Sequence, residues 1–199
     1  MIRLSSSYSS STSADDTIIP EEFVKRYKLQ GETLPKNKSG VRLTTETGHT
    51  VQTDVPKRMG GQDTAPQPVE LLLAAWMGCT QATALFVGRQ MSMNKKGDGY
   101  SKRFVLERLV FQDIQGERDE RGALTLPIDE APSVPSRLQR IHGTIIVYRA
   151  GGLPISNEEM TLLREQTESR CPVANMMIAS GCRMDVDWID GSTLVSVSV

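Results

Sequence analysis

Two cysteines are the residues of this 199-residue chain best suited to chemistry. Cys79 lies within a long apolar segment, and Cys171 directly precedes a proline. Because the thiolate is the reactive form of cysteine, each position is judged by what stabilises negative charge there. Cys171 is expected at a helix N-terminus, whose dipole contributes roughly 0.3–1 kcal/mol, less than one pKa unit. A strong shift also requires a cation such as the adjacent Arg170; without one, Cys171 is a surface capping residue.

Cys79 has less local support. Its neighbours at helical spacings of three, four and seven residues are almost all apolar: Leu72, Ala75, Trp76, Ala82, Thr83 and Phe86. Burial among such side chains raises the pKa of a thiol rather than lowering it. If Cys79 reacts, a cation must come from another segment or another subunit. By residue statistics alone, a packed core cysteine is favoured at this position.

The remaining cysteine and the two histidines carry weaker signals. Cys182 follows a glycine and enters a predicted strand, so we expect it to be a small buried hydrophobe. His49 and His142 both fall in strand patterns and are interpreted as structural. A cysteine hydrolase would need a histidine near a thiol, and His142 is the candidate base for that minor alternative.

The composition excludes several classes of partner. A net charge of −1 with 24% charged residues gives no electrostatic footprint for nucleic acid or an anionic membrane. GxGxxG and P-loop spacings are absent, so we expect no nucleotide cofactor. Three widely spaced cysteines without a CxxC pair argue against a zinc or other metal site and against a secreted disulfide framework. A reducing, cytoplasmic compartment fits them better.

The segment that must position Cys79 runs over residues 68–89. It has no charged residue between Glu70 and Arg89, and Pro68 suits the first position of a helix. Apolar residues occur on every face, which predicts a helix surrounded by other structure. Its uncharged run of about 18 residues is at the lower limit for a membrane span. The run also contains polar residues and glycines, so a buried central helix is favoured and no membrane association is expected.

Cys171 is positioned by two predicted helices. Ser156 followed three residues later by Glu159 forms a capping box that opens the first helix. Pro172 cannot continue a helix interior, so it is interpreted as the first residue of a new, short helix that ends near Ser180. Cys171 is then the cap of that helix.

Strands are expected around these helices, at residues 23–29, 41–45, 49–53, 104–111, 141–148, 184–189 and 194–199. Residues 35–40 are predicted to be a loop, and the second and third strands to form a hairpin. A charged, Pro-rich segment at about residues 113–137 is predicted to be an insertion. Residues 21–199 therefore read as one α+β domain. The Ser-rich residues 1–20 are interpreted as a disordered tail, or alternatively as a mitochondrial targeting segment.

Several motifs together resemble the OsmC/Ohr family over roughly residues 23–190. They are Asp54-Val55-Pro56, Gly60-Gly61, Pro68-Val69-Glu70-Leu71-Leu72-Leu73-Ala74-Ala75-Trp76-Met77-Gly78-Cys79, and the distant Cys171-Pro172-Val173. The resemblance implies an intertwined homodimer in which β-sheets wrap long central helices. It also implies a two-cysteine thiol peroxidase, in which Cys79 attacks an organic hydroperoxide and becomes a sulfenic acid. Cys171 would resolve this acid as a disulfide, and a dithiol reductant would restore both thiols.

Two departures from the family pattern bear on that activity. Peroxidases of the family carry a glutamate ten residues before the first cysteine, where this chain has Val69; its acid, Glu70, comes one place later. The family's arginine comes from the N-terminal strand region, where Arg42 lies, but no motif fixes its role. The pattern is therefore more similar to the less characterised OsmC-like branch. The alternative function is a non-catalytic OsmC-like dimer that binds a small apolar ligand.

Overall fold

The computed structural model describes residues 19–93 and 104–194, which belong to two compact units with their boundary after Ala65. The predicted tail therefore lies almost wholly outside the described residues, as does most of the last predicted strand. The prediction of a single domain stays a prediction. Each unit is described by itself below.

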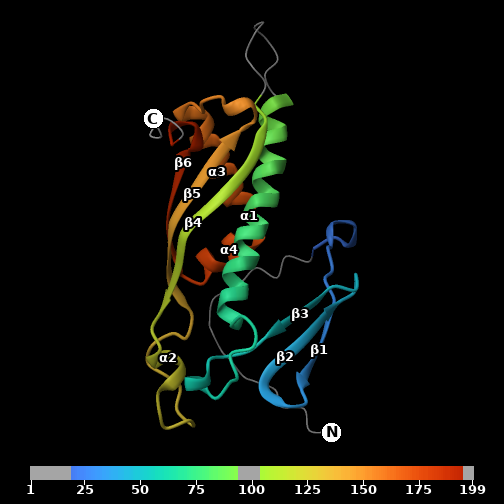
Figure 1. Ribbon diagram of the computed structural model, residues 1–199, viewed down its shortest axis with the longest axis vertical. Coiled ribbons are helices and arrows are strands. Elements are labelled where there is room, and N and C mark those ends of the chain that lie inside the picture. The colour runs from blue at the N-terminus through green and yellow to red at the C-terminus, as the bar shows by residue number, and fades with distance from the viewer. Residues whose placement is uncertain (1–18, 94–103, 195–199) are drawn as a thin grey trace, which may run out of the picture. The chain divides into compact units, whose positions relative to one another are not determined.

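The first unit is a three-stranded antiparallel sheet of β1 (Leu29–Leu34), β2 (Asn37–Thr45) and β3 (Thr50–Thr53), in that order (Figure 1). Short 3-10 turns, Glu21–Phe23 and Lys57–Met59, lie on either side of it in the sequence. The β2–β3 hairpin was expected. The first strand and the loop at 35–40 were predicted wrongly, because β1 and β2 pair up to Leu34 and Asn37 across a tight turn.

A buried carboxylate organises the segment that follows β3. Asp54 has no exposed surface. Its Oδ1 accepts hydrogen bonds from the Ser39 hydroxyl (2.8 Å) and the Val55 N–H (2.7 Å). Its Oδ2 accepts from the Gln62 N–H (3.2 Å), the Thr64 N–H (3.0 Å) and the Thr64 hydroxyl (2.9 Å). The loop closes so tightly that a Cβ at Gly61 would lie 1.8 Å from the Val55 carbonyl oxygen.

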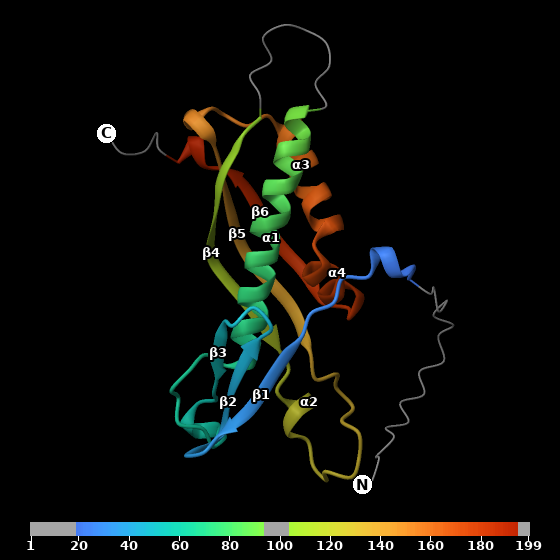
Figure 2. The same ribbon diagram turned by 90° about the vertical axis from the view of Figure 1, so that its right-hand side faces the viewer.

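The second unit has a sheet of β4 (Leu106–Arg118), β5 (Leu138–Arg149) and β6 (Arg183–Asp190). β4 and β5 are antiparallel, whereas β5 and β6 are parallel. The helices α1 (Pro68–Met93), α3 (Asn157–Arg170) and α4 (Pro172–Ala179) lie on one face of this sheet (Figures 1 and 2). The short helix α2 (Arg121–Leu124) lies between β4 and β5, and 3-10 turns occur at Ala150–Gly152 and Gly191–Thr193. An α+β fold was expected and is confirmed.

The strands of this sheet are longer than predicted. β4 continues to Arg118, so the connection to β5 covers residues 119–137 instead of 113–137. The extension passes an irregularity at Asp113, whose φ is +52°. Opposite it, Gly143 has φ +143°, and a Cβ there would lie 2.7 Å from the Asp113 carbonyl oxygen. A glycine is required at residue 143 because this φ and this close approach to the backbone of β4 leave no room for a Cβ.

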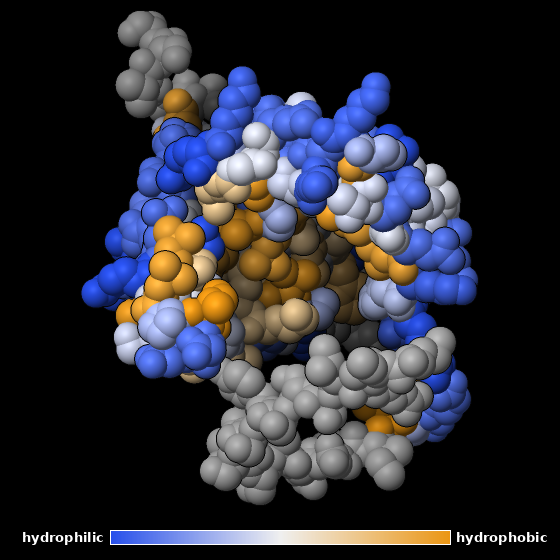
Figure 3. Space-filling model, turned by 90° about the horizontal axis from the view of Figure 1, so that it is seen from below, coloured by the Kyte–Doolittle hydropathy of each residue, from blue (hydrophilic) through white to orange (hydrophobic). Residues whose placement is uncertain are grey.

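Helix α1 is only partly covered within the second unit. Its inner side, with Trp76, Ala84 and Val87, belongs to the core against β4 and α3. Leu72 (42% exposed) and Phe86 (53% exposed) lie on an uncovered face. The expectation of a helix surrounded on all sides is therefore not met by this unit alone. By length and composition α1 could also cross a membrane. In the view from below, Figure 3 shows apolar side chains, coloured orange, at the surface.

Candidate active site

Cys171 lies at the junction between α3 and α4. The predicted capping box opens α3: the Ser156 hydroxyl accepts from the Glu159 N–H, and the Glu159 carboxylate accepts from the Ser156 N–H, both at 3.2 Å. At the other end, the Cys171 N–H donates to the Thr167 carbonyl (3.0 Å). The Cys171 sulfur accepts from the Ala174 N–H (3.4 Å) and so caps α4, as predicted. Cys171 is fully buried, which excludes a surface cap.

The middle of α1 faces this junction. Thr80 Oγ1 lies 4.0 Å from the Cys171 sulfur, and the half-buried Cys79 thiol lies within hydrogen-bonding range of the Cys171 thiol. The fold thus brings together two thiols that are about ninety positions apart in the sequence. Their catalytic roles stay predictions, but their contact gives the site its geometry.

The surroundings of Cys171 keep its thiol protonated. Burial raises its pKa most, while the hydrogen bond from the Ala174 N–H opposes this rise. The hydrogen bond and charge of Cys79 raise the pKa further, and the Thr80 hydroxyl lowers it weakly. The net direction is upward, so Cys171 is a neutral thiol at pH 7. None of these groups is a cation.

The guanidinium of Arg170, the cation adjacent to Cys171, is bonded along α3. It donates hydrogen bonds to the Gln166 side chain and to the Ser169 hydroxyl, and it is exposed on the last turn of α3. The side chain therefore turns back along its own helix. Arg170, the adjacent cation that the sequence offered for Cys171, is therefore held on its own helix.

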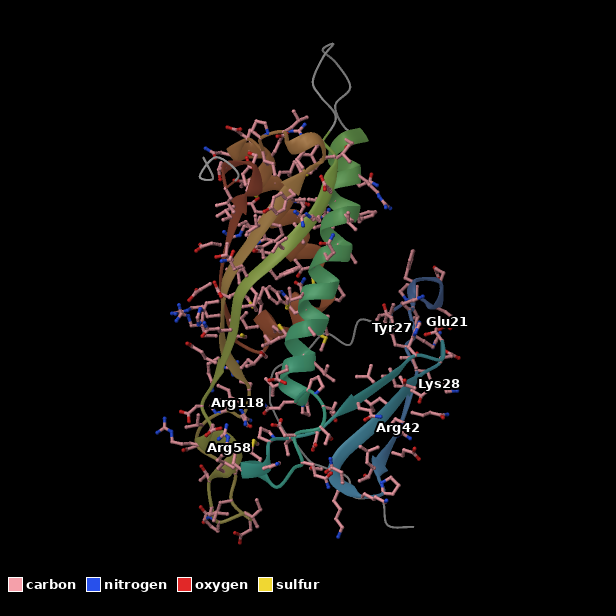
Figure 4. All side chains as sticks on the ribbon, in the orientation of Figure 1. Glu21, Tyr27, Lys28, Arg42, Arg58 and Arg118 are labelled. Carbon is pink, nitrogen blue, oxygen red and sulfur yellow. The ribbon has the colours of Figure 1, made fainter. Side chains whose placement is uncertain are left out.

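Val69, Glu70 and Arg42 are the residues of this chain that were compared with the family's acid and arginine, and each has partners of its own. Val69 packs against the core, and Glu70 accepts a hydrogen bond from the Gln67 N–H (2.8 Å) at the start of α1. Arg42 is on β2 of the first unit (Figure 4), with its guanidinium 3.7 Å from Glu32. Glu70 thus accepts a backbone hydrogen bond at the start of its own helix, and Arg42 lies near Glu32. We therefore place neither residue in the thiol site.

The structure gives the surroundings of two other candidates, Cys182 and His142. Cys182 is buried, as expected, and burial raises its pKa although Arg137 opposes the rise. His142 Nε2 on β5 lies 3.3 Å from the Glu117 carboxylate. Among the described residues no hydrogen bond joins His142 to a cysteine thiol, so this pair gives no support to the hydrolase alternative.

A larger pocket lies between α1 and α3. Its volume is about 840 Å³. Apolar side chains and a polar rim line it: Phe86, Val87, Gln90, Met91, Phe104, Ser156, Glu158, Glu159, Leu162, Gln166 and Arg170. The size is typical of small-molecule sites. Phe86 follows Cys79 by seven residues, which places the pocket about 10 Å along α1 from the thiol.

The sequence analysis missed two hydroxyl groups near Cys171. Thr80 and Thr167 are both buried, and both line a small cavity behind this junction. A signal was present for each: Thr80 directly follows Cys79 in an apolar helix, and Thr167 precedes Cys171 by one helical turn.

The fold is α+β, and its long helix α1 places Cys79 near Cys171, the N-cap residue of α4. Few classes of protein combine these features. The sequence profile of the family described as OsmC-like protein matches residues 61–187. The chain belongs to this OsmC-like family. A search of curated protein sequences gives no match.

Solved structures share the fold at low sequence identity. An OsmC-like protein from Mycoplasma pneumoniae is 18% identical, with 83% of this chain and 97% of that chain covered and a TM-score of 0.58. An organic hydroperoxide resistance protein OsmC from Legionella pneumophila is 12% identical, with 83% and 98% covered and a TM-score of 0.52. An OsmC-like protein of unknown function from Vibrio cholerae is 10% identical, with 84% and 99% covered and a TM-score of 0.54. These similarities support the fold.

Proposed function

We propose that this protein is a thiol-dependent peroxidase that reduces organic hydroperoxides in the defence against oxidative stress. The observation that carries the proposal is the proximity of Cys79 to Cys171, close enough for Cys79 to raise the pKa of the Cys171 thiol. Family membership supports a redox role, since one structural relative is named an organic hydroperoxide resistance protein. The apolar surroundings of Cys79 suit an organic peroxide better than hydrogen peroxide.

The different burial of the two thiols supports the roles that we propose for them. Cys79 is half-buried and can be reached, whereas Cys171 is fully enclosed. Cys79 attacks the terminal oxygen of R–O–OH, the O–O bond breaks, and ROH leaves, so that Cys79 becomes a sulfenic acid. The Cys171 sulfur then attacks the Cys79 sulfur, the S–O bond breaks, and water leaves. A dithiol reductant returns the resulting disulfide to two thiols.

We further propose that the uncovered face of α1 packs against the same face of a second copy. Leu72 and Phe86 lie on this face, and small residues such as Gly78 lie between them. A Cβ built at Gly78 would meet no atom within 4 Å, so the surface there is open. Small residues allow two helices to approach closely, and burial of the exposed side chains would favour the dimer. The cation that Cys79 needs would come from a segment outside α1 or from this second copy.

Steady-state turnover tests the peroxidase. Purified protein is given cumene hydroperoxide and dithiothreitol, and peroxide loss is followed. We expect Cys79→Ser to lower kcat/KM by at least about a thousandfold, because the attacking group itself is removed. Cys182→Ser is the matched control and should retain activity. A Cys79→Ser variant that is as active as the wild type would refute the peroxidase.

The second candidate function is binding of a small apolar ligand, which the pocket of about 840 Å³ between α1 and α3 favours. Binding of a fluorescent fatty-acid probe tests it. This function predicts that binding survives Cys79→Ser and is weakened by Leu162→Glu, which places a charge on the apolar lining. Probe binding without peroxide turnover would favour it over the peroxidase.

The three cysteines of the sequence are odd in number, widely spaced and without a CxxC pair. We therefore propose that the protein works in a reducing, cytoplasmic compartment. Cell fractionation with antibody detection tests this location against the mitochondrial alternative.

A further inference from the structure

A small cavity lies behind Cys171, with a volume of about 20 Å³. It is enclosed by residues of α1, α3, α4 and the sheet: Trp76, Thr80, Ile145, Thr167, Glu168, Ala174, Ile178, Met184, Val186 and Trp188. Thr167 has no exposed surface, and among the described residues its hydroxyl has no hydrogen-bond partner. A buried hydroxyl without a partner is costly, so this group requires an explanation.

The cavity has the size and the chemistry for one water molecule. A cavity in which the centre of a water-sized sphere can move through about 10–15 Å³ is large enough for a single water, provided that polar groups hold the water. Thr167 and Thr80 line the cavity from two different helices and provide two hydroxyl groups. A water between them would give the Thr167 hydroxyl its missing partner.

We propose that a water in this cavity links the Thr167 hydroxyl to Thr80, whose Oγ1 lies 4.0 Å from the Cys171 sulfur, so that a hydrogen-bonded chain ends on the resolving thiol. Thr167 donates to the water, the water donates to Thr80, and Thr80 donates to sulfur. Thr80 and Thr167 are thus positioning residues, and this role rests on the proposed peroxidase function.

The chain acts at the step that forms the disulfide. There the Cys171 S–H bond breaks, the S–S bond forms, the S–O bond of the Cys79 sulfenic acid breaks, and the leaving hydroxide takes up the proton as water. Negative charge develops on the Cys171 sulfur as its proton leaves. The Ala174 N–H already donates to this sulfur at 3.4 Å, and the hydroxyl chain adds a second donor. Stabilising the thiolate lowers the pKa of the attacking group.

Resolution kinetics test the chain in the full-length protein. One equivalent of cumene hydroperoxide is added, sulfenic acid is trapped with dimedone, and disulfide formation is followed over a range of pH. For Thr167→Val, which keeps the shape but removes the hydroxyl, we expect disulfide formation to slow about three- to tenfold at pH 7, the effect of one hydrogen bond. Its pH profile should move to higher pH, while Cys79 oxidation keeps its rate. Thr167→Ser should restore the profile.

A second measurement separates this inference from the peroxidase. In a Cys79→Ser, Cys182→Ser background Cys171 is the only thiol, and its titration is read from ultraviolet thiolate absorbance without any peroxide. We expect adding Thr167→Val to raise the Cys171 pKa there. An unchanged pKa together with a higher Tm would overturn the inference, because a dry cavity makes loss of the hydroxyl stabilising. Absence of a Cys79 sulfenic acid in the wild type would instead refute the peroxidase.

Discussion

Asp54 in the first unit and Cys171 in the second are both fully buried, yet their proton affinities change in opposite directions. Burial raises the pKa of both groups. At Asp54, hydrogen bonds from Thr64, Ser39 and Val55 outweigh burial and hold the pKa well below its usual range. At Cys171 the donors lie at 3.4 Å and 4.0 Å from sulfur, and burial prevails.

The difference shows that close hydrogen-bond donors decide whether the pKa of a buried acid in this protein ends below or above its ordinary value. The Asp54 carboxylate is a permanent anion around which a loop is folded. The Cys171 thiol is neutral at pH 7 because its pKa is raised. A buried neutral thiol is protected from direct oxidation, which suits a resolving cysteine in the proposed cycle.

The largest expected effect comes from removing the anion at Asp54. Asp54→Asn leaves only one acceptor oxygen for donors that now occupy both carboxylate oxygens. We expect the Tm of the first unit to fall by on the order of 10 °C, as measured by calorimetry. Hydrogen exchange should also speed up at the Val55, Gln62 and Thr64 amides. Asp63→Asn, an exposed neighbour in the same loop, is the control and should change Tm little.

The same comparison predicts an acid limit to stability. Because the folded pKa of Asp54 is lowered, its contribution is complete above the unfolded value of about 3.9. It is lost as the pH falls from there toward the folded pKa. Urea unfolding between pH 6 and pH 2 should show this loss in the wild type and much less of it in Asp54→Asn. An identical acid dependence in both proteins would contradict the assignment.

A smaller effect is expected at an exposed helix cap, which can be compared with the buried sulfur cap of Cys171. Ser156→Ala removes the side-chain oxygen that accepts from Glu159 N–H at the start of α3. The expected cost is about 1 kcal/mol, measured by urea unfolding followed through Trp76 and Trp188 fluorescence. Ser156→Asp, which keeps an acceptor, should retain most of the stability. A loss as large as that of Asp54→Asn would show that packing, not capping, decides at this position.

The smallest effect is expected at alkaline pH. The folded pKa of Cys171 is raised, so the unfolded chain loses this proton first, and stability falls as the pH rises above about 8.5. Cys171→Ala should flatten this alkaline slope. Cys182→Ala should flatten it as well, since burial also raises the pKa of Cys182. A slope that neither variant changes would show that the two thiols are not held neutral by the fold.

Local signals in the sequence predicted the elements that position the thiols. The absence of charge between Glu70 and Arg89 predicted α1, the Ser156–Glu159 pair predicted the start of α3, and Pro172 predicted the cap at Cys171. Each of these signals depends on residues that are close neighbours in the sequence, so it can be recognised without knowledge of the fold.

Features that depend on distant partners were not predicted from local pattern. β1 was placed too early because its register is set by pairing with β2, and β4 was ended too early because its polar second half pairs with β5 across the Gly143 bulge. The contact between Cys79 and Cys171 followed only from the family resemblance. The cavity hydroxyls were missed because burial of Thr167 depends on α1, α3 and the sheet together.

The most direct test of the account is peptide mapping by mass spectrometry after one equivalent of cumene hydroperoxide. The account predicts a single new cross-linked peptide pair that joins Cys79 to Cys171, with Cys182 still reduced. The account would be contradicted if all three cysteines remained reduced thiols after the peroxide treatment, or if the disulfide joined Cys171 to Cys182 instead.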